Sequence, residues 1–177
     1  FAFLLPMIFI NDNKKYNLND ALFIIGSILF IGLSFNLLIL VRNYDLQYTI
    51  YLFLITVVTD TFALITGRYI GITPLAEKIS PKKTVEGLIG GVAMGTFVAS
   101  MFYCFVIDSS VSLVNVVTVT LLLSFVGQLG DLVFSFIKRY YDTKDFSNLI
   151  PGHGGILDRL DSMIFVVLAF VLCLSMI

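Results

Sequence analysis

The stretch that decides the fold is residues 111–137, VSLVNVVTVTLLLSFVGQLGDLVFSFI. Its 27 residues include one charged side chain, Asp131, and two basic residues follow at once. A helix that spans a bilayer needs about 20 mostly apolar residues, so this stretch is long enough to cross. At about 1.5 Å per residue the helix would be about 40 Å long, which exceeds the hydrocarbon core. It is therefore predicted to tilt, to protrude, or to bend near Gly127 and Gly130.

The whole chain has the composition of a membrane protein. Of its 177 residues, 58% are apolar or aromatic and 13% are charged, and the mean hydropathy is +0.98. An ordinary soluble domain carries about 25% charged residues. The formal net charge of −1 provides no overall positive field, so nucleic acid is excluded as a partner. Cys104 and Cys173 lie in apolar runs without metal-ligand spacing, which argues against a zinc site or a disulfide framework.

Five apolar stretches are predicted to be membrane spans. They are residues 21–41, 49–66, 88–107, 111–137 and 162–177, of which the last is short but ends at the last residue given. Residues 1–10 are also apolar but too short to cross, and are interpreted as the end of a helix whose beginning is missing. We therefore expect an all-α fold, a polytopic transmembrane helix bundle that forms a single integral-membrane catalytic domain over residues 1–177. Further N-terminal helices are expected to be missing from it.

The basic residues predict how the bundle is oriented. If the connections alternate between the two sides, residues 11–20, 67–87 and 138–161 share one side. That side holds ten of the eleven Lys and Arg residues, and the other side holds Arg42. Positive charge accumulates on the cytoplasmic side of membrane proteins. The sequence thus predicts a protein of the cytoplasmic (inner) membrane with its active-site loops facing the cytoplasm.

Small residues recur every four positions in the stretch that begins at Gly87. Gly91, Gly95 and Ala99 continue the repeat, which places all four on one helix face. Such a face lets a second helix backbone approach closely. The second helix could belong to the same chain or to a partner in a homodimer, or the face could bind substrate. We favour packing within the chain.

Acidic residues lie where lipid would otherwise be expected. Asp60 and Asp131 lie within predicted spans, near their positively charged ends. A carboxylate at the bilayer centre costs roughly 2.5 to 3.5 kcal/mol, so such residues usually face a protein interior or a wet cavity. An interhelical hydrogen bond or a buried ion pair would also explain them. The face around Asp131 is polar over several turns, because it carries Gln128, Asp131, Ser135 and Lys138.

The last polar connection supplies two more acids. Asp158 and Asp161 are three residues apart at the start of a predicted helix, so they share a face. With Asp131 they could provide hard oxygen ligands at the membrane boundary. Mg²⁺ suits such a place, because it takes one or two carboxylates and completes its shell with water and phosphate oxygens. Nearby basic residues favour phosphoryl chemistry; they are Lys138, Arg139, Lys144 and Arg159.

Two loops on the basic side could contact an anion. Residues 151–155 read PGHGG, and their glycines would let backbone amides approach a phosphate. His153 could donate to a phosphate or fix the loop, and both alternatives stay open. Residues 80–87 read SPKKTVEG, and their lysines could bind a substrate or anionic lipid head groups. Neither loop has the pattern of a P-loop or of a Rossmann dinucleotide site.

These segments together resemble the signature of the phosphatidate cytidylyltransferases, also called CDP-diacylglycerol synthases. The resemblance rests on SFIKR (135–139), Lys144-Asp145 and HGGILDRLD (153–161), at fixed spacing over 27 positions. Upstream it includes Asp60-Thr61, Gly67-Arg68, SPKKTVEG and Gly90-Gly91, so it runs from about Asp60 to Asp161. Leu64 departs from the family, which often has an aromatic residue there. Members also generally carry further N-terminal helices.

The resemblance implies a reaction and roles for individual residues. CTP and phosphatidic acid would give CDP-diacylglycerol and pyrophosphate, with Mg²⁺ as the cofactor. By similarity Asp131 and Asp158 are the first metal ligands, with Asp161 close behind, while Asp60 would orient a basic residue or hold a second cation. The catalytic group would consist of Asp131, Asp158, Asp161, Lys138 and Arg139. The basic residues that would hold the triphosphate or the lipid phosphate are Lys138, Arg139, Lys144 and Arg159. The residues implied in substrate binding are Ser80, Lys82, Lys83, Thr84, Lys144, His153, Gly154, Gly155 and Arg159.

Three other functions remain as alternatives at this stage. A CTP-dependent polyprenol or lipid-alcohol kinase would use similar residues but transfer the γ-phosphoryl group. A cytidylyltransferase for ether lipids would share the chemistry and differ in substrate. A proton- or cation-coupled transporter would use Asp60 and Asp131 as relay or coordinating groups. Transport, however, does not require dense basic loops or the fixed spacing from HGG to the acids.

Overall fold

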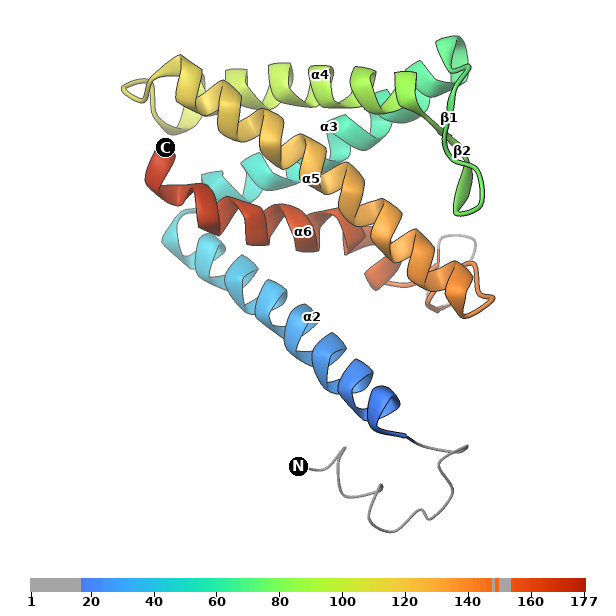
Figure 1. The fold of residues 1–177 in the computed structure, drawn as a ribbon. Helices are drawn as coiled ribbons and strands as arrows, with labels where there is room; N and C mark the ends of the chain where they lie inside the picture. The colour runs from blue at the N-terminus through green and yellow to red at the C-terminus, as the bar shows by residue number, and fades with distance from the viewer. Residues whose placement is uncertain (1–16, 148, 150–153) are drawn as a thin grey trace. The chain divides into compact units, whose positions relative to one another are not determined.

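The computed structural model describes residues 17–147, 149 and 154–177. Figure 1 shows a largely helical molecule. Its main elements are α2 (Leu18–Tyr44), α3 (Leu46–Ile70), β1 (Pro74–Ala76), β2 (Ser80–Thr84), α4 (Val85–Phe102), α5 (Leu113–Tyr140) and α6 (Leu157–Cys173). A π-helical turn, Tyr103–Ile107, extends α4, and a short 3-10 turn, Leu174–Met176, follows α6. The partial span predicted over residues 1–10 lies outside the described part.

Five helices among the described residues are long and apolar enough to cross a membrane. Each overlaps one of the complete predicted spans, which confirms the prediction of an all-α, polytopic bundle. The boundaries differ most at α6, which begins at Leu157 and not at Ser162. The reason is that Asp158 and Asp161 lie inside the first turns of the helix and face a polar pocket, so the helix starts before its apolar part.

The chain divides into two compact units, Phe1–Asn36 and Leu37–Ile177. The first unit contains the greater part of α2. The second contains every other helix and the hairpin, and all the candidate site residues that the structure describes. In this second unit α5 and α6 contribute to one buried apolar core, with members that include Val116, Val119, Leu123, Val166, Val167 and Phe170.

A β-hairpin stands between α3 and α4, where the sequence predicted a polar connection without regular structure. Its strands are antiparallel, with Pro74 opposite Thr84 and Ala76 opposite Ser80, and with an irregularity between these pairs. Strands this short, containing proline and lysines, carry too little alternation of apolar and polar residues to be recognised from sequence. In Figure 1 the hairpin lies at the same end of the second unit as the C-terminal end of α5.

The small residues of α4 face α3 within the same chain. A Cβ atom built on Gly91 would lie 2.5 Å from the Thr59 carbonyl oxygen and 2.7 Å from the Ala63 Cβ. Gly87 is similarly close to Ala63 and to the Gly67 backbone. This confirms the favoured prediction that the repeat serves packing within the chain, because any larger residue would push the two backbones apart.

Gly91→Ala is therefore expected to destabilise the bundle, at a cost of about 1 to 3 kcal/mol for overpacking. The matched control is Gly26→Ala in α2, because a Cβ atom there would meet nothing within 4 Å. Alanine is the better helix former, so the control is expected to unfold at the wild-type temperature or above it. Thermal unfolding in detergent, followed by helical circular dichroism, measures both variants. Equal unfolding temperatures for the two would contradict the expected overpacking.

Candidate active site

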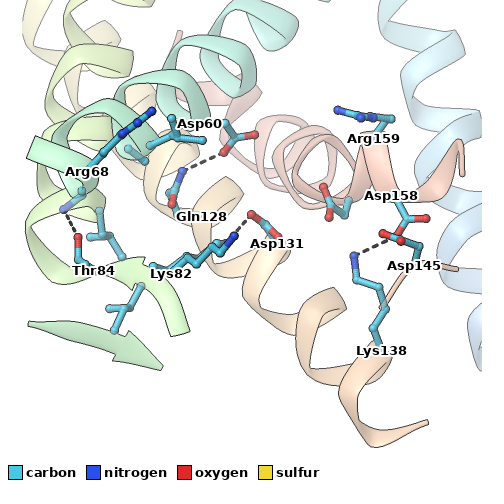
Figure 2. Close-up of a pocket in the computed structure, with 18 residues that line it drawn as sticks. Asp60, Arg68, Lys82, Thr84, Gln128, Asp131, Lys138, Asp145, Asp158 and Arg159 are labelled. Atoms are coloured by element: carbon cyan, nitrogen blue, oxygen red, sulfur yellow. Dashed lines mark hydrogen bonds and ion pairs between the residues drawn. The ribbon is translucent and has the colours of Figure 1, made fainter. Parts of the chain in front are cut away.

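A pocket opens between α3, the hairpin, α4, α5 and the start of α6 (Figure 2). Its volume of about 830 Å³ is large enough for a nucleotide-sized ligand. The lining residues are Asp60, Ala63, Leu64, Gly67, Arg68, Leu75, Lys82, Lys83, Thr84, Gly87, Leu88, Gln128, Asp131, Lys138, Asp145, Asp158, Arg159 and Asp161. Five of them are acidic and five are basic, so the wall offers oxygen donors for a cation beside positive charges for an anion.

Lys83 on β2 forms an ion pair with Asp131 on α5. The other carboxylate oxygen of Asp131 accepts a hydrogen bond of 3.3 Å from the Ser135 hydroxyl, one helical turn further along. Both members of the pair are partly exposed, with 22% and 25% of their side-chain surfaces accessible. The pair therefore joins the hairpin to α5 at the pocket wall while leaving both charges open to a ligand.

A second ion pair joins Lys138 on α5 to Asp158 on α6, with 3.0 Å between the ammonium nitrogen and a carboxylate oxygen. It is more buried than the first, with 12% and 6% of the side chains exposed. Asp158 also accepts hydrogen bonds from the backbone amides of Phe146, at 3.0 Å, and Gly155, at 2.9 Å. Lys138 lies 5.3 Å from the centre of the Phe146 ring. Asp158 thus holds the connection between α5 and α6 against the end of α5.

The glycines before α6 explain how Asp158 can make these contacts. Gly154 has a φ of 77°, a conformation that costs glycine little and other residues more. A Cβ atom there would also lie within 3.2 Å of an Asp158 carboxylate oxygen. Gly155 uses its amide to bind that carboxylate. In this structure the described part of the HGG segment therefore positions a side chain of its own chain.

Asp60 brings three helices together at the pocket. The Gln128 amide of α5 donates to one of its carboxylate oxygens at 2.9 Å, and the Ser162 hydroxyl of α6 approaches the other at 3.5 Å. Gln128 itself is buried. Asp161 is also buried, and its carboxylate accepts the amide of Ser162 at 2.8 Å. Asp161 is thus buried at the start of α6, whereas Asp60 remains exposed and joins α3 to α5 and α6 through its two carboxylate oxygens.

The pocket offers carboxylate oxygens that could hold a metal ion. Within the part of the chain that the structure describes, no three His, Cys, Asp or Glu side chains are grouped closely enough to hold one ion. Mg²⁺ does not require such a group, because it is usually held by one or two carboxylates together with water and substrate phosphates. Carboxylate oxygens line the pocket from α3, α5 and α6. These hard donors fit Mg²⁺ and not a thiophilic metal.

Most of the predicted site residues are brought together by the fold. Those that line the pocket are Asp60, Lys82, Lys83, Thr84, Asp131, Lys138, Asp158, Arg159 and Asp161. The described residues from the prediction that do not line it are Ser80, Arg139, Lys144, Gly154 and Gly155. The Arg139 guanidinium donates instead to the carbonyl oxygens of Ile79, at 3.3 Å, and Thr143, at 3.0 Å. His153 lies outside the described residues.

Three polar residues of the pocket were not among the predicted site residues. Arg68, at the end of α3, and Asp145, in the connection between α5 and α6, both line the pocket. Both belong to the motif segments quoted for the family resemblance, which was the available signal. Gln128 shares a helix face with Asp131, and its hydrogen bond to Asp60 gives that face a specific role.

The chain is similar in sequence to several bacterial proteins that share one name. Phosphatidate cytidylyltransferase of Staphylococcus saprophyticus is 41% identical over 165 residues, which cover 93% of this chain and 63% of the relative. The protein of the same name from Staphylococcus haemolyticus is 40% identical over the same shares of the two chains. That of Staphylococcus aureus is 41% identical over 88% of this chain and 59% of its own length.

The chain therefore spans about three fifths of the length of these relatives. A model of the cytidylyltransferase family matches residues 1–177, the whole of the chain. The match includes all the elements that build the pocket, from α3 to α6. By this match and by its relatives, the chain belongs to the cytidylyltransferase family.

Proposed function

We propose that this chain carries the active site of a phosphatidate cytidylyltransferase, which converts CTP and phosphatidic acid to CDP-diacylglycerol and pyrophosphate. The single observation that carries the proposal is the pocket itself. In it Asp131 forms an ion pair with Lys83, and Asp158 forms one with Lys138. In both pairs the acid and the lysine come from different elements of the fold. Relatives that share these segments bear the name phosphatidate cytidylyltransferase, which supports this reaction over other uses of the same charges.

The proposed reaction is an in-line displacement at phosphorus. A phosphate oxygen of the lipid attacks the α-phosphorus of CTP, and the bond from that phosphorus to the β-phosphate oxygen breaks. Pyrophosphate leaves with the electron pair of the broken bond. Such transfers depend mainly on positioning and on neutralising phosphate charge. Lys82, Lys83 and Lys138 supply positive charge around the pocket, and Arg68 and Arg159 add to it from α3 and α6.

The lysines have a second part in this proposal. Lys83 and Lys138 neutralise Asp131 and Asp158 in the ligand-free chain. When a triphosphate enters with its cation, each lysine can exchange its carboxylate for a phosphate oxygen without leaving a buried charge unpaired. This keeps the cost of buried charge low before and after binding, because an unpaired charge in a protein interior is expensive.

We propose Mg²⁺ as the cofactor, with Asp131 and Asp158 as the first ligands and Asp161 as the next candidate. Asp60 would serve a second cation or orient a basic residue. When bound, the ion would neutralise charge on the phosphates of CTP. The support for Mg²⁺ is the carboxylate donor set of the pocket and its fit to an ion that shares its shell with substrate oxygens.

The apolar residues of the pocket suit an amphiphilic substrate. Leu64, Leu75 and Leu88 line it beside the charged groups, so a lipid phosphate could enter with its glycerol carbons against an apolar wall. The five described helices that are long and apolar enough to cross a membrane support a pocket close to a bilayer surface. We propose that the basic loops around it face the cytoplasm, where CTP is present, as the bias of Lys and Arg favours.

The test uses the full-length protein in detergent with Mg²⁺, phosphatidic acid, and CTP labelled on either the α- or the γ-phosphate. We expect α-label in the lipid fraction and one pyrophosphate released for each lipid product. γ-Label in a lipid product would instead identify a lipid kinase. Transfer to ether-linked but not diacyl phosphatidic acid would identify an ether-lipid enzyme. No transfer to any lipid by a folded protein would contradict the proposal and favour a transporter.

A further inference from the structure

Arg139 links two segments that flank the pocket. It lies in the last turn of α5, and its Nε donates to the carbonyl oxygen of Ile79 at 3.3 Å. Its Nη1 donates to the carbonyl oxygen of Thr143 at 3.0 Å. Ile79 belongs to the turn between β1 and β2, and Thr143 to the start of the connection between α5 and α6. One guanidinium thus bridges the tip of the hairpin and the connection.

The Thr143 carbonyl is held in place by the way α5 ends. Asp142 has a φ of 52°, a left-handed conformation that turns the chain back after the last helical residues. The amide and the hydroxyl of Thr143 then both donate to the Lys138 carbonyl oxygen, at 2.9 and 3.1 Å. The backbone around Thr143 is therefore fixed by local hydrogen bonds, and Arg139 has a preformed acceptor.

The hairpin is held at two other points. At its base, the Glu86 carboxylate accepts the backbone amides of Ile72 and Thr73, at 3.2 Å. Also near the base, beside the Thr84 that pairs with Pro74, Lys83 forms an ion pair with Asp131 across the pocket. The contact of Arg139 with Ile79 adds a third point at the far end. Three holds along its length fix where the hairpin stands relative to α5.

The hairpin contributes to the site because residues of strand β2 line the pocket. Lys82, Lys83 and Thr84 lie consecutively on β2 and all line the pocket. Arg139 does not line the pocket in the described structure, so it reaches the site through the hairpin. A change at the tip would move the positive groups of β2 relative to the acids of α5.

We propose that Arg139 is a positioning residue that latches the hairpin tip to the connection and so fixes the lysines of β2 for nucleotide binding. The statement that the ligand is a nucleotide rests on the proposed function. The latch is inferred from the contacts of Arg139 alone and does not depend on that function. It differs from the role that the family resemblance implied, which was direct contact with phosphate.

The two roles make opposite demands on the side chain. A phosphate contact requires positive charge, which lysine would keep. A bridge between two carbonyl oxygens requires a planar fork with separate donors, and the single ammonium of lysine does not reproduce that geometry. Arg139→Lys therefore separates the roles, and Arg139→Gln removes both the charge and the fork.

The first readout is a distance and needs no substrate. Spin labels are placed at Lys78→Cys in the hairpin turn and Tyr140→Cys at the end of α5, both exposed, after Cys104 and Cys173 are replaced by serine. In full-length protein with Arg139 intact, pulsed electron paramagnetic resonance is expected to give one narrow distance distribution. Both Arg139→Lys and Arg139→Gln are expected to broaden it. A distribution unchanged in Arg139→Gln would overturn the latch, whether or not the protein transfers cytidylyl groups.

The second readout is kinetic. Both variants are expected to raise the KM for CTP by roughly tenfold with a smaller change in kcat, because the misplaced lysines weaken nucleotide binding while the acids stay in place. Arg42→Gln, in the last turn of α2, is the control and is expected to leave both constants unchanged. If Arg139→Lys keeps the wild-type KM and the narrow distance, Arg139 acts through charge, and the latch is wrong. Absence of transfer in the wild type would contradict the proposed function and leave the distance test valid.

Discussion

Asp131→Asn is expected to reduce cytidylyl transfer at least about a hundredfold while the protein remains folded and inserted in the membrane. Asparagine has nearly the same shape and can still accept the Ser135 hydroxyl. It carries no charge, so it cannot balance Lys83 or bind a cation strongly. The carboxylate lies on the pocket wall, where both of these tasks would be performed.

Folding should be little affected by this change. The partner lysine is 22% exposed and belongs to the hairpin, so water can solvate it once its carboxylate is lost. Transfer of α-label from CTP measures activity, and size-exclusion chromatography with circular dichroism measures folding. Asp108→Asn, in the connection between α4 and α5, is the control and is expected to retain full activity. Near-normal transfer by Asp131→Asn would show that this carboxylate is not needed for cytidylyl transfer.

Asp158→Asn is expected to abolish transfer as well, but with a second effect that Asp131→Asn lacks. Asp158 accepts two backbone amides and the Lys138 ammonium together. An asparagine side chain has only one acceptor oxygen. Its amide nitrogen, itself a donor, would therefore face one of the groups that donate to Asp158 and could not accept from it. Lys138, 12% exposed, would be left without its partner. Breaking a buried pair by removing one member costs about 3 to 5 kcal/mol, so the connection between α5 and α6 should loosen.

This second effect is measured by proteolysis after Lys144, which lies in that connection. An endoprotease specific for lysine is expected to cut Asp158→Asn faster than the wild type or Asp131→Asn. Asp142→Asn is the control in the same connection, because asparagine tolerates the left-handed conformation at that position and Asp142 does not line the pocket in the described structure. Wild-type cleavage of Asp158→Asn would show that the carboxylate does not organise the connection, and wild-type transfer would remove it from the active site.

The membrane spans could be predicted because the signal for them is local. A run of about 20 apolar residues has to cross a bilayer whatever its neighbours do, and Leu113–Tyr140 is such a run. The predicted span began only at Ser162 because Asp158 and Asp161 interrupt the apolar run. The prediction that these two acids lie at the start of a helix is confirmed by α6, which begins at Leu157. The hairpin was missed for a related reason: its strands are short and do not alternate apolar and polar residues, and its contacts with Glu86 of α4 and Asp131 of α5 leave no local pattern in the sequence.

The candidate site was predictable in its residue types and only partly in its geometry. Asp131 and Lys138 were placed on one face by helical periodicity, and both line the pocket. The pairing of Asp131 with Lys83 joins positions 48 residues apart, and no spacing rule connects them. Gln128 shares that face, but its hydrogen bond to Asp60 depends on how α3 lies relative to α5.

The membrane environment of this protein, its all-α class and the residue types at its site can all be predicted from the sequence alone. Hydropathy and helical periodicity are patterns of nearby residues, so they can be recognised without the tertiary structure. The tertiary structure decided which charges meet. In the structure the Gly155 amide donates to Asp158, and the Arg139 guanidinium donates to two backbone carbonyl oxygens. The sequence had predicted phosphate as the partner of both the glycine loop and the arginine. Those choices depend on where the end of α5 lies relative to the hairpin and α6, and distances between separate elements are fixed by packing and not by local sequence.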